Sequence, residues 1–199
     1  YIEASVLQTA ADTFGTAPLF LALGLVMAGL FFKLAAVPAH YWAPDAYEGA
    51  PTPAVALFSI APKVGALILL MRLMEALPLA LDLRILLAAA ALLSLLLGNL
   101  LALYQVNVKR LLAYSGIGHT GYLLLPLIAG TQGGEANVFF YLVIYTVLNL
   151  GFFMAIGVFA PQRGSANFNQ WKGLGMRNPL LAVAAIVLLV GLAGLPPTS

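Results

Sequence analysis

The stretch Leu79–Tyr104, LALDLRILLAAAALLSLLLGNLLALY, decides the fold of this chain. It is apolar on all sides, and it is long enough to cross a bilayer core, which takes roughly 20 helical residues. A strand of a membrane barrel would instead alternate in polarity over about 10 residues. The stretch therefore predicts a membrane-spanning α-helix.

Comparable runs recur along the chain, at Pro18–Tyr41, Pro53–Met74, Leu111–Ile128, Val138–Ala160 and from Pro179 onward. The segments between the runs are predicted as loops and turns: Trp42–Thr52, Glu75–Pro78, Gln105–Arg110, Ala129–Asn137 and Pro161–Asn178. The sequence thus predicts an all-α, polytopic transmembrane bundle of about six helices, the last incomplete. Residues 1–199 are expected to form part of a single transmembrane domain.

Composition supports this fold class and excludes several functions. The chain is 62% hydrophobic and 8% charged, whereas soluble domains carry roughly 25% charged residues. It has no cysteine, which excludes disulfides, thiolate metal sites and thiolate-ligated iron–sulfur clusters within the chain. The net charge of +2 points to no nucleic-acid partner. Because Tyr1 is no initiator and GLAGLPPTS stops inside an apolar run, we expect an internal fragment of a longer protein.

Basic residues in the predicted loops indicate the orientation. Helix alternation puts Lys109, Arg110, Arg163, Lys172 and Arg177 on one side, and Arg72 and Arg84 on the other. Lysine and arginine are retained on the cytoplasmic side of membrane proteins. The first group is therefore expected to face the cytoplasm.

The remaining two lysines, Lys33 and Lys63, lie inside predicted helices. A charged lysine at a helix centre costs roughly 2.5 to 3.5 kcal/mol. Burial disfavours the charged form, which suits a group that accepts and releases protons. The alternative is that each side chain snorkels to the headgroups. Proton translocation through Lys33 and Lys63 is the favoured interpretation.

Each lysine has a proline nearby. Pro38 cannot donate to the carbonyl of Leu34, and Pro62 cannot donate to that of Phe58. Broken helices at membrane depth recur at transporter sites, although proline is also common in ordinary membrane helices. The two prolines predict helix breaks.

Other polar residues are second-rank candidates for a proton path. Tyr141, Tyr145 and Asn149 are spaced by four, so they share a helix face. His119 lies in a predicted helix and His40 at the end of another, and histidine titrates near neutral pH. Hydrogen bonding between helices explains all of these residues equally well.

The glycine-rich stretch GIGHTG, Gly116–Gly121, has the spacing of a dinucleotide-binding loop. That motif needs a preceding strand and a βαβ unit, whereas this stretch runs into YLLLPLIAG, part of a membrane helix. Close helix packing through small residues is the better interpretation.

One long motif resembles a known family. The stretch Phe32–Pro53, FKLAAVPAHYWAPDAYEGAPTP, is similar to the signature of the antiporter-like membrane subunits of respiratory complex I, and its DAYEGAP form is that of the N type. NLLALYQVNVKRLLAYSGIGHTGYLL from Asn99 and the final LAGLPPTS match in the same order. The resemblance spans nearly the whole chain.

The resemblance implies a fourteen-helix subunit with discontinuous helices, of which this chain would be helices seven to eleven and the start of helix twelve. Lys33 and Lys63 would be the seventh- and eighth-helix lysines of the proton path. The glutamate that pairs with the former would lie upstream, and the twelfth-helix lysine downstream. Glu3 and Asp12 lie too close to the first helix to replace that glutamate.

It also implies a function. The chain would belong to a proton-pumping, non-catalytic subunit of NADH-quinone oxidoreductase, a translocase of a bacterial inner membrane. NADH, FMN, iron–sulfur clusters and quinone would be bound by other subunits, and the partners would be the lipid bilayer and other membrane subunits of the complex, including homologous ones. Two alternatives stay open: a subunit of a multisubunit cation/proton antiporter or membrane-bound hydrogenase, and a structural scaffold without its own proton path.

Overall fold

A computed structural model of the chain describes residues 15–76, 83–131, 133–159 and 167–194, together with Thr9 and Asp12. Its principal helices are α2 (Thr16–Leu34), α3 (Trp42–Gly49), α4 (Thr52–Phe58), α5 (Ala61–Ala76), α6 (Leu83–Leu103), α7 (Val108–Ala129), α8 (Gly134–Phe159) and α10 (Pro179–Leu192). Short helices η1 (Phe168–Trp171) and α9 (Leu174–Arg177) precede α10. In the part of the chain that the structure describes, the only β feature is an isolated bridge between Asn107 and Asn167. The predicted all-α class is confirmed.

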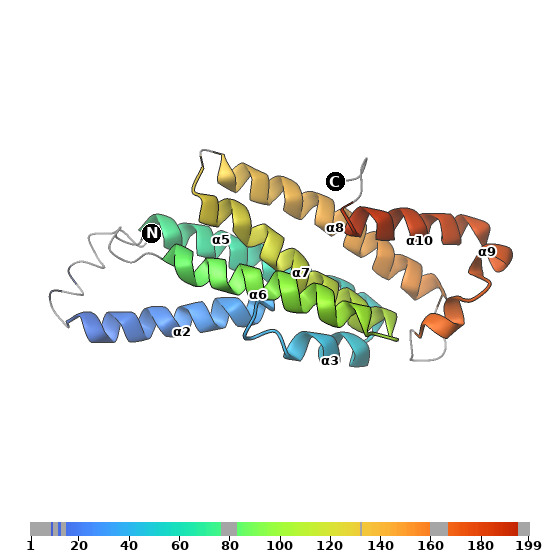
Figure 1. The fold of residues 1–199 in the computed structure, drawn as a ribbon, viewed down its shortest axis with the longest axis horizontal. Helices are drawn as coiled ribbons and strands as arrows, with labels where there is room; N and C mark the ends of the chain where they lie inside the picture. Colours follow the sequence, from blue (N-terminus) through green and yellow to red (C-terminus); the bar gives the residue numbers. More distant parts are fainter. Residues whose placement is uncertain are drawn as a thin grey trace.

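The long helices lie roughly side by side along one axis (Figure 1). Among the described residues, five segments are long and apolar enough to cross a membrane: Ala17–Leu34, Thr52–Ala76, Leu83–Leu103, Val108–Ala129 and Gly134–Val158. The shorter apolar helix α10 follows them. Together they agree with the predicted bundle of about six apolar helices.

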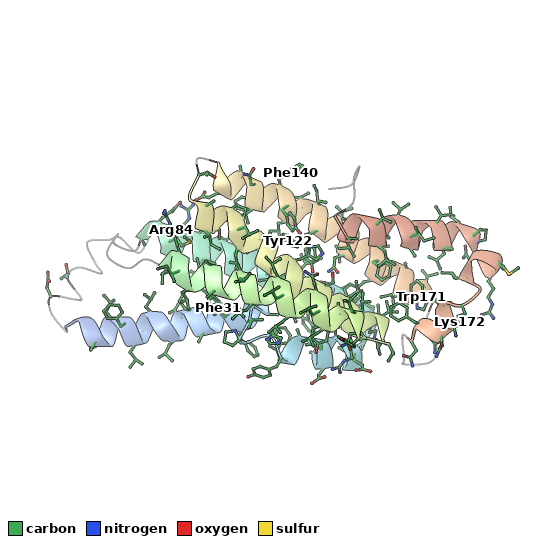
Figure 2. All side chains as sticks on the ribbon, in the orientation of Figure 1. Phe31, Arg84, Tyr122, Phe140, Trp171 and Lys172 are labelled. Atoms are coloured by element: carbon green, nitrogen blue, oxygen red, sulfur yellow. The ribbon has the colours of Figure 1, made fainter. Side chains whose placement is uncertain are left out.

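The basic residues separate toward the two ends of this bundle. Figure 2 shows Arg84 at one end of the long axis and Lys172 at the other. The start of α7, which holds Lys109 and Arg110, lies toward the same end as Lys172 (Figure 1). This arrangement agrees with the predicted orientation. Arg163, Glu3 and the final LPPTS of the family motif lie outside the described residues.

The first predicted helix is shorter than expected and is followed by a half-helix. It ends at Leu34, where Ala35 adopts a left-handed conformation with φ 54°. The predicted loop Trp42–Thr52 is wrong over most of its length, because α3 occupies Trp42–Gly49 and continues along the bundle axis (Figure 1). Together α2 and α3 form a discontinuous helix with an irregular turn between them.

The next span is also broken. Helix α4 ends at Phe58 and α5 begins at Ala61, with Pro62 as the second residue of α5. Because Pro62 has no backbone N–H, the normal bond to the Phe58 carbonyl cannot form. The break separates two buried apolar clusters: Ile60 packs in the one that includes α3 and α4, and Ala66 in the one that includes α2 and much of α6. Lys63 lies between them in the chain.

Helices α6 and α7 pack closely through glycines. A Cβ added at Gly98 would lie 2.5 Å from the backbone nitrogen of Gly118, and one at Gly121 would lie 2.8 Å from the carbonyl oxygen of Ala91. Such contacts are typical of small residues at membrane helix interfaces. The GIGHTG stretch lies inside α7, so its interpretation as a helix-packing motif is confirmed.

Candidate functional site

The side chain of Lys63 is buried at the break between α4 and α5, with 3% of its surface exposed. Its Nζ atom donates a hydrogen bond to the carbonyl oxygen of Gly116 in α7. The same atom lies 5.2 Å from the centroid of the Tyr145 ring in α8. Among the described residues no carboxylate forms an ion pair with Lys63. A carbonyl dipole and an aromatic face are therefore the contacts that accommodate its charge.

Gly116 provides the space for this arrangement. A Cβ added there would lie 3.1 Å from the Tyr145 hydroxyl oxygen and 3.3 Å from the Lys63 Nζ atom. Both distances are tighter than ordinary van der Waals contacts, so a larger residue would displace the phenol or the amine by a few tenths of an ångström. The glycine thus has a role at the lysine in addition to helix packing.

A series of aromatic side chains extends from Lys63 across the bundle. The ring of His119 in α7 lies 4.8 Å from that of Tyr145, centroid to centroid. The His119 Nδ1 atom is joined by a 2.7 Å hydrogen bond to the Tyr141 hydroxyl. Three of the second-rank candidates therefore come together beside Lys63, on helices α7 and α8.

A cavity of about 290 Å³ lies beside these aromatic residues. Its polar lining comes from His119, Tyr122, Tyr141 and Tyr145, and its opposite wall is the end of α10 at Gly191–Gly194. Tyr122 is labelled in Figure 2, close to where α7 passes α8. Most of the lining is apolar, but a space of this size has room for several waters, which need 2–4 polar partners each. The tyrosines and the histidine offer such partners.

Asn149 does not belong to this series of aromatic side chains, although it lies on the same face of α8 as Tyr141 and Tyr145. Its amide donates a 2.6 Å hydrogen bond to the Ser59 hydroxyl, and that hydroxyl donates to the carbonyl of Ala56 at 2.7 Å. Ser59 is the residue directly after α4. Asn149 thus ties α8 to the helix break one turn before Lys63.

The remaining candidates lie apart from Lys63. Lys33 is exposed in the last turn of α2, within the candidate span Ala17–Leu34, because the helix ends earlier than the sequence predicts. His40 lies in the turn between α2 and α3, and its Nδ1 atom is buried without a hydrogen-bond partner among the described residues. Pro38 lies in the same turn, beyond the end of α2. It therefore follows a helix end and does not interrupt a continuing helix.

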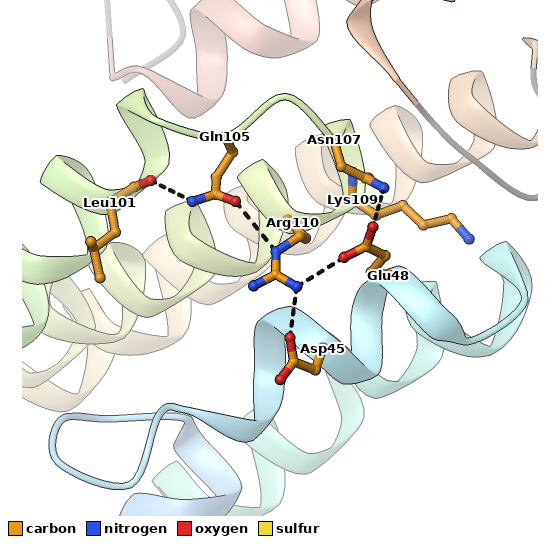
Figure 3. Close-up of polar contacts among 7 residues, drawn as sticks. All are labelled: Asp45, Glu48, Leu101, Gln105, Asn107, Lys109 and Arg110. Atoms are coloured by element: carbon orange, nitrogen blue, oxygen red, sulfur yellow. Dashed lines mark hydrogen bonds and ion pairs between the residues drawn. The ribbon is translucent and has the colours of Figure 1, made fainter.

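A separate polar group, which we call the Arg110 cluster, fastens α3 to the α6–α7 turn. It comprises Asp45, Glu48, Gln105, Asn107, Lys109 and Arg110 (Figure 3). The Arg110 Nη1 atom lies 2.6 Å from the Asp45 carboxylate and 2.8 Å from that of Glu48. Asn107 donates to Glu48 at 3.0 Å, and the Lys109 ammonium donates to the carbonyl of Ala50 just after α3 at 2.9 Å. The cluster fixes the position of the half-helix.

Replacing Arg110 with alanine should loosen α3, because the neighbouring carboxylates Asp45 and Glu48 would then repel each other without a cation between them. We expect a loss of about 1 kcal/mol, since the pairs are partly exposed and such pairs contribute about 0.2–1 kcal/mol each. The measurement is the thermal stability of the purified full-length subunit. Arg72→Ala is the matched control, because the Arg72–Glu75 pair is exposed and within one helix. Equal losses in both variants would contradict a special role for the cluster.

Several residues that build this site carry no sequence signal of their own. Thr120 in α7 is fully buried, and its hydroxyl donates to the carbonyl of Leu34 at 2.8 Å. Ser94 in α6 accepts from the backbone N–H of Val37 at 3.0 Å. Both satisfy backbone groups that the end of α2 exposes. The predicted break at Pro38 implied that such partners must exist, but not where in the chain they lie.

A membrane bundle with discontinuous helices and a buried lysine at a helix break defines the class of antiporter-like membrane subunits. The chain belongs to the NADH:quinone oxidoreductase/Mrp antiporter transmembrane family, whose sequence pattern matches residues 4–199. The expected family is thereby confirmed, and with it the membrane location.

Individual relatives agree with this assignment. The chain is 44% identical over 190 residues to NADH-quinone oxidoreductase subunit N of Chlorobium chlorochromatii (strain CaD3), covering 90% of this chain and 37% of that protein. It is 42% identical over 179 residues to NAD(P)H-quinone oxidoreductase subunit 2 of Synechococcus sp. (strain JA-3-3Ab), covering 89% and 34%. The chain therefore spans about a third of the length of these relatives.

Solved structures show the same fold. A chain of respiratory complex I from Thermus thermophilus with bound aureothin matches with a TM-score of 0.74 and 37% identity, over 89% of this chain and 39% of that one. A chain of the membrane-bound sulfane sulfur reductase, an archaeal respiratory membrane complex, matches with a TM-score of 0.82 and 32% identity, over 97% and 40%. The expectation of an antiporter-like fold is confirmed.

Proposed function

We propose that this chain is part of a proton-translocating membrane subunit of an NADH-quinone oxidoreductase. The observation that carries the proposal is Lys63, a buried amine held between a backbone carbonyl and an aromatic ring at a helix break. Ionisable residues in membrane spans are rare and are usually functional. A lysine without a carboxylate partner among the described residues is suited to give up its proton and take it back.

The path that we propose runs from Lys63 past Tyr145 to His119 and Tyr141. The histidine and the phenols can each accept and donate a hydrogen bond. Lys63 and His119 share no direct hydrogen bond among the described contacts, so water in the adjoining cavity, which Tyr145 and His119 both line, would extend the connection from Tyr145. His40, with its buried and unpartnered Nδ1 atom, is a further proposed relay at the α2–α3 turn.

The proposed role of Lys33 depends on other helices of the full-length subunit. Its face of α2 also exposes apolar residues such as Val26, two turns earlier, which is 44% exposed. We propose that further helices of the full-length subunit cover this face and supply a carboxylate to Lys33, as the family resemblance implies. The pairing would keep the ammonium charged inside the membrane.

The electron-transfer reaction is proposed to take place in other subunits. We expect NADH, FMN, iron–sulfur clusters and quinone to bind there, and this chain to contact the lipid bilayer and neighbouring membrane subunits. The absence of cysteine from the chain supports this division of labour, because it removes the thiolates that clusters need. The subunit would contribute pumping to a translocase without catalysing the redox step itself.

A second candidate function is a place in another ion-translocating respiratory complex. The match to the membrane-bound sulfane sulfur reductase, at a TM-score of 0.82, favours it. Sequence identity favours the NADH-quinone oxidoreductase, because it is 32% to that chain and 44% to an NADH-quinone oxidoreductase subunit. The NADH-quinone oxidoreductase is therefore the preferred assignment.

Purification of the tagged full-length subunit from its native membrane separates these candidates. We expect it to co-purify with a complex that reduces quinone with NADH and acidifies or alkalinises sealed vesicles as it does so. Sulfane sulfur or proton reduction by the purified complex, without NADH-quinone activity, would support the second candidate. A complex that reduces quinone and moves no protons would contradict both and favour the scaffold interpretation.

A further inference from the structure

The side chain of Thr120 joins α7 to the end of α2. It is fully buried in α7, and its Oγ1 atom lies 2.8 Å from the carbonyl oxygen of Leu34 and 3.0 Å from that of Gly116. Leu34 is the last residue of α2 and directly follows Lys33. Gly116 is the residue whose carbonyl accepts from Lys63. One hydroxyl therefore touches the backbone next to one lysine and the acceptor of the other.

The Leu34 carbonyl depends on this contact. The chain leaves the helix at Ala35, and Pro38 has no N–H to offer to this oxygen. A buried carbonyl without a donor is costly, and most of all within a membrane. Thr120 supplies the donor that the backbone cannot.

The Gly116 carbonyl is shared. It lies within hydrogen-bond distance of both the Lys63 ammonium and the Thr120 hydroxyl. A threonine hydroxyl has a single proton to donate. While Lys63 donates to Gly116, the Thr120 proton is best used at Leu34, and when Lys63 withdraws, the Gly116 carbonyl competes for that proton.

We propose that Thr120 is a positioning residue that couples the state of Lys63 to the end of α2 and so to Lys33. This inference rests on the proposed proton-translocating function. A charged Lys63 leaves the hydroxyl on Leu34 and keeps the last turn of α2 fixed. Departure of the Lys63 side chain from Gly116 draws the hydroxyl away and releases the Leu34 carbonyl, which loosens the turn that carries Lys33.

The test compares variants of the full-length subunit in the intact complex, reconstituted in sealed vesicles. Thr120→Val removes the hydroxyl and nearly keeps the shape, and Thr120→Ser keeps the hydroxyl. Thr146→Val is the matched control, because the Thr146 hydroxyl bonds only to Leu142 of its own helix, at 2.7 Å, among the described contacts. The readout is the number of protons taken up per quinone reduced, with Lys63→Met measured in parallel.

We expect Thr120→Val to lose proton uptake per quinone to about the extent of Lys63→Met, and Thr120→Ser and Thr146→Val to match the parent. Full uptake in Thr120→Val overturns the inference, as does an equal loss in Thr120→Ser, which would mean that packing of the methyl group matters and the hydroxyl does not. If Thr120→Val does not assemble, Thr120→Cys replaces it, and failure of that variant to assemble would make the residue purely structural. If neither Thr120→Val nor Lys63→Met reduces proton uptake per quinone, that result would contradict the proposed function itself.

Discussion

Replacing Gly98 with valine is expected to prevent the assembly of the subunit. The first side-chain atom would lie 2.5 Å from the Gly118 nitrogen and 2.9 Å from the Tyr114 carbonyl oxygen, and both are backbone atoms that cannot rotate away. Helices α6 and α7 would have to separate along an interface that the surrounding packing depends on. Overpacking typically costs 1–3 kcal/mol and occasionally more, and we expect about 3 kcal/mol or more here.

The measurement for Gly98→Val is the amount of full-length subunit in membranes and in the purified complex. Gly24→Val is the matched control, because it makes the same change within a membrane helix where an added Cβ meets no described atom within 4 Å. The control makes the same change in helix propensity and removes only the clash. Normal amounts of the Gly98 variant would show that α6 and α7 do not approach as closely as described.

Replacing Lys63 with methionine is expected to abolish the contribution of this subunit to pumping while the complex still assembles. Methionine has a flexible, unbranched side chain of similar length, so it can fill the space without a charge or a proton. Gly116 would lose one hydrogen-bond donor but keeps the Thr120 hydroxyl within 3.0 Å. Because that hydroxyl has one proton for two carbonyls, either Gly116 or Leu34 then lacks a donor, and we expect a stability loss of about 1–3 kcal/mol.

A conservative change on the same helix controls for repacking in this experiment. Leu67→Met lies one turn beyond Lys63, and Leu67 is buried with 1% of its surface exposed. It inserts the same side chain into the same helix without removing a titratable group. Equal effects of Lys63→Met and Leu67→Met on pumping would assign the loss to packing and not to the amine.

The helical fold was predictable because its signal is local. Runs such as Leu79–Tyr104 contain their own evidence for a membrane helix, and α6 (Leu83–Leu103) follows that run closely. The half-helix α3 was missed because its eight residues, WAPDAYEG, are too short and too polar to read as a span. It is held by Arg110, 65 residues from Asp45, and no local pattern reveals such a contact.

The site was predictable only in part, because contacts between residues far apart in the sequence leave no local pattern. Lys63 stands out because a lysine within an apolar run is costly wherever it lies. The partners of Lys63 do not stand out: Gly116 is 53 residues away, and Thr120 resembles any other membrane threonine. Asn149 was predictable only in part, because helix periodicity correctly placed it beside Tyr145 but could not show that its amide bonds to Ser59.

The most direct test of the central claim is the number of protons taken up per quinone reduced, in sealed vesicles that contain the complex with Lys63→Met. Quinone reduction by NADH and the subunit content of the complex are measured in the same preparation, beside the parent and Leu67→Met. The account predicts fewer protons per quinone in Lys63→Met alone, with the complex intact. An unchanged ratio in an intact Lys63→Met complex would contradict the claim that this buried lysine carries protons.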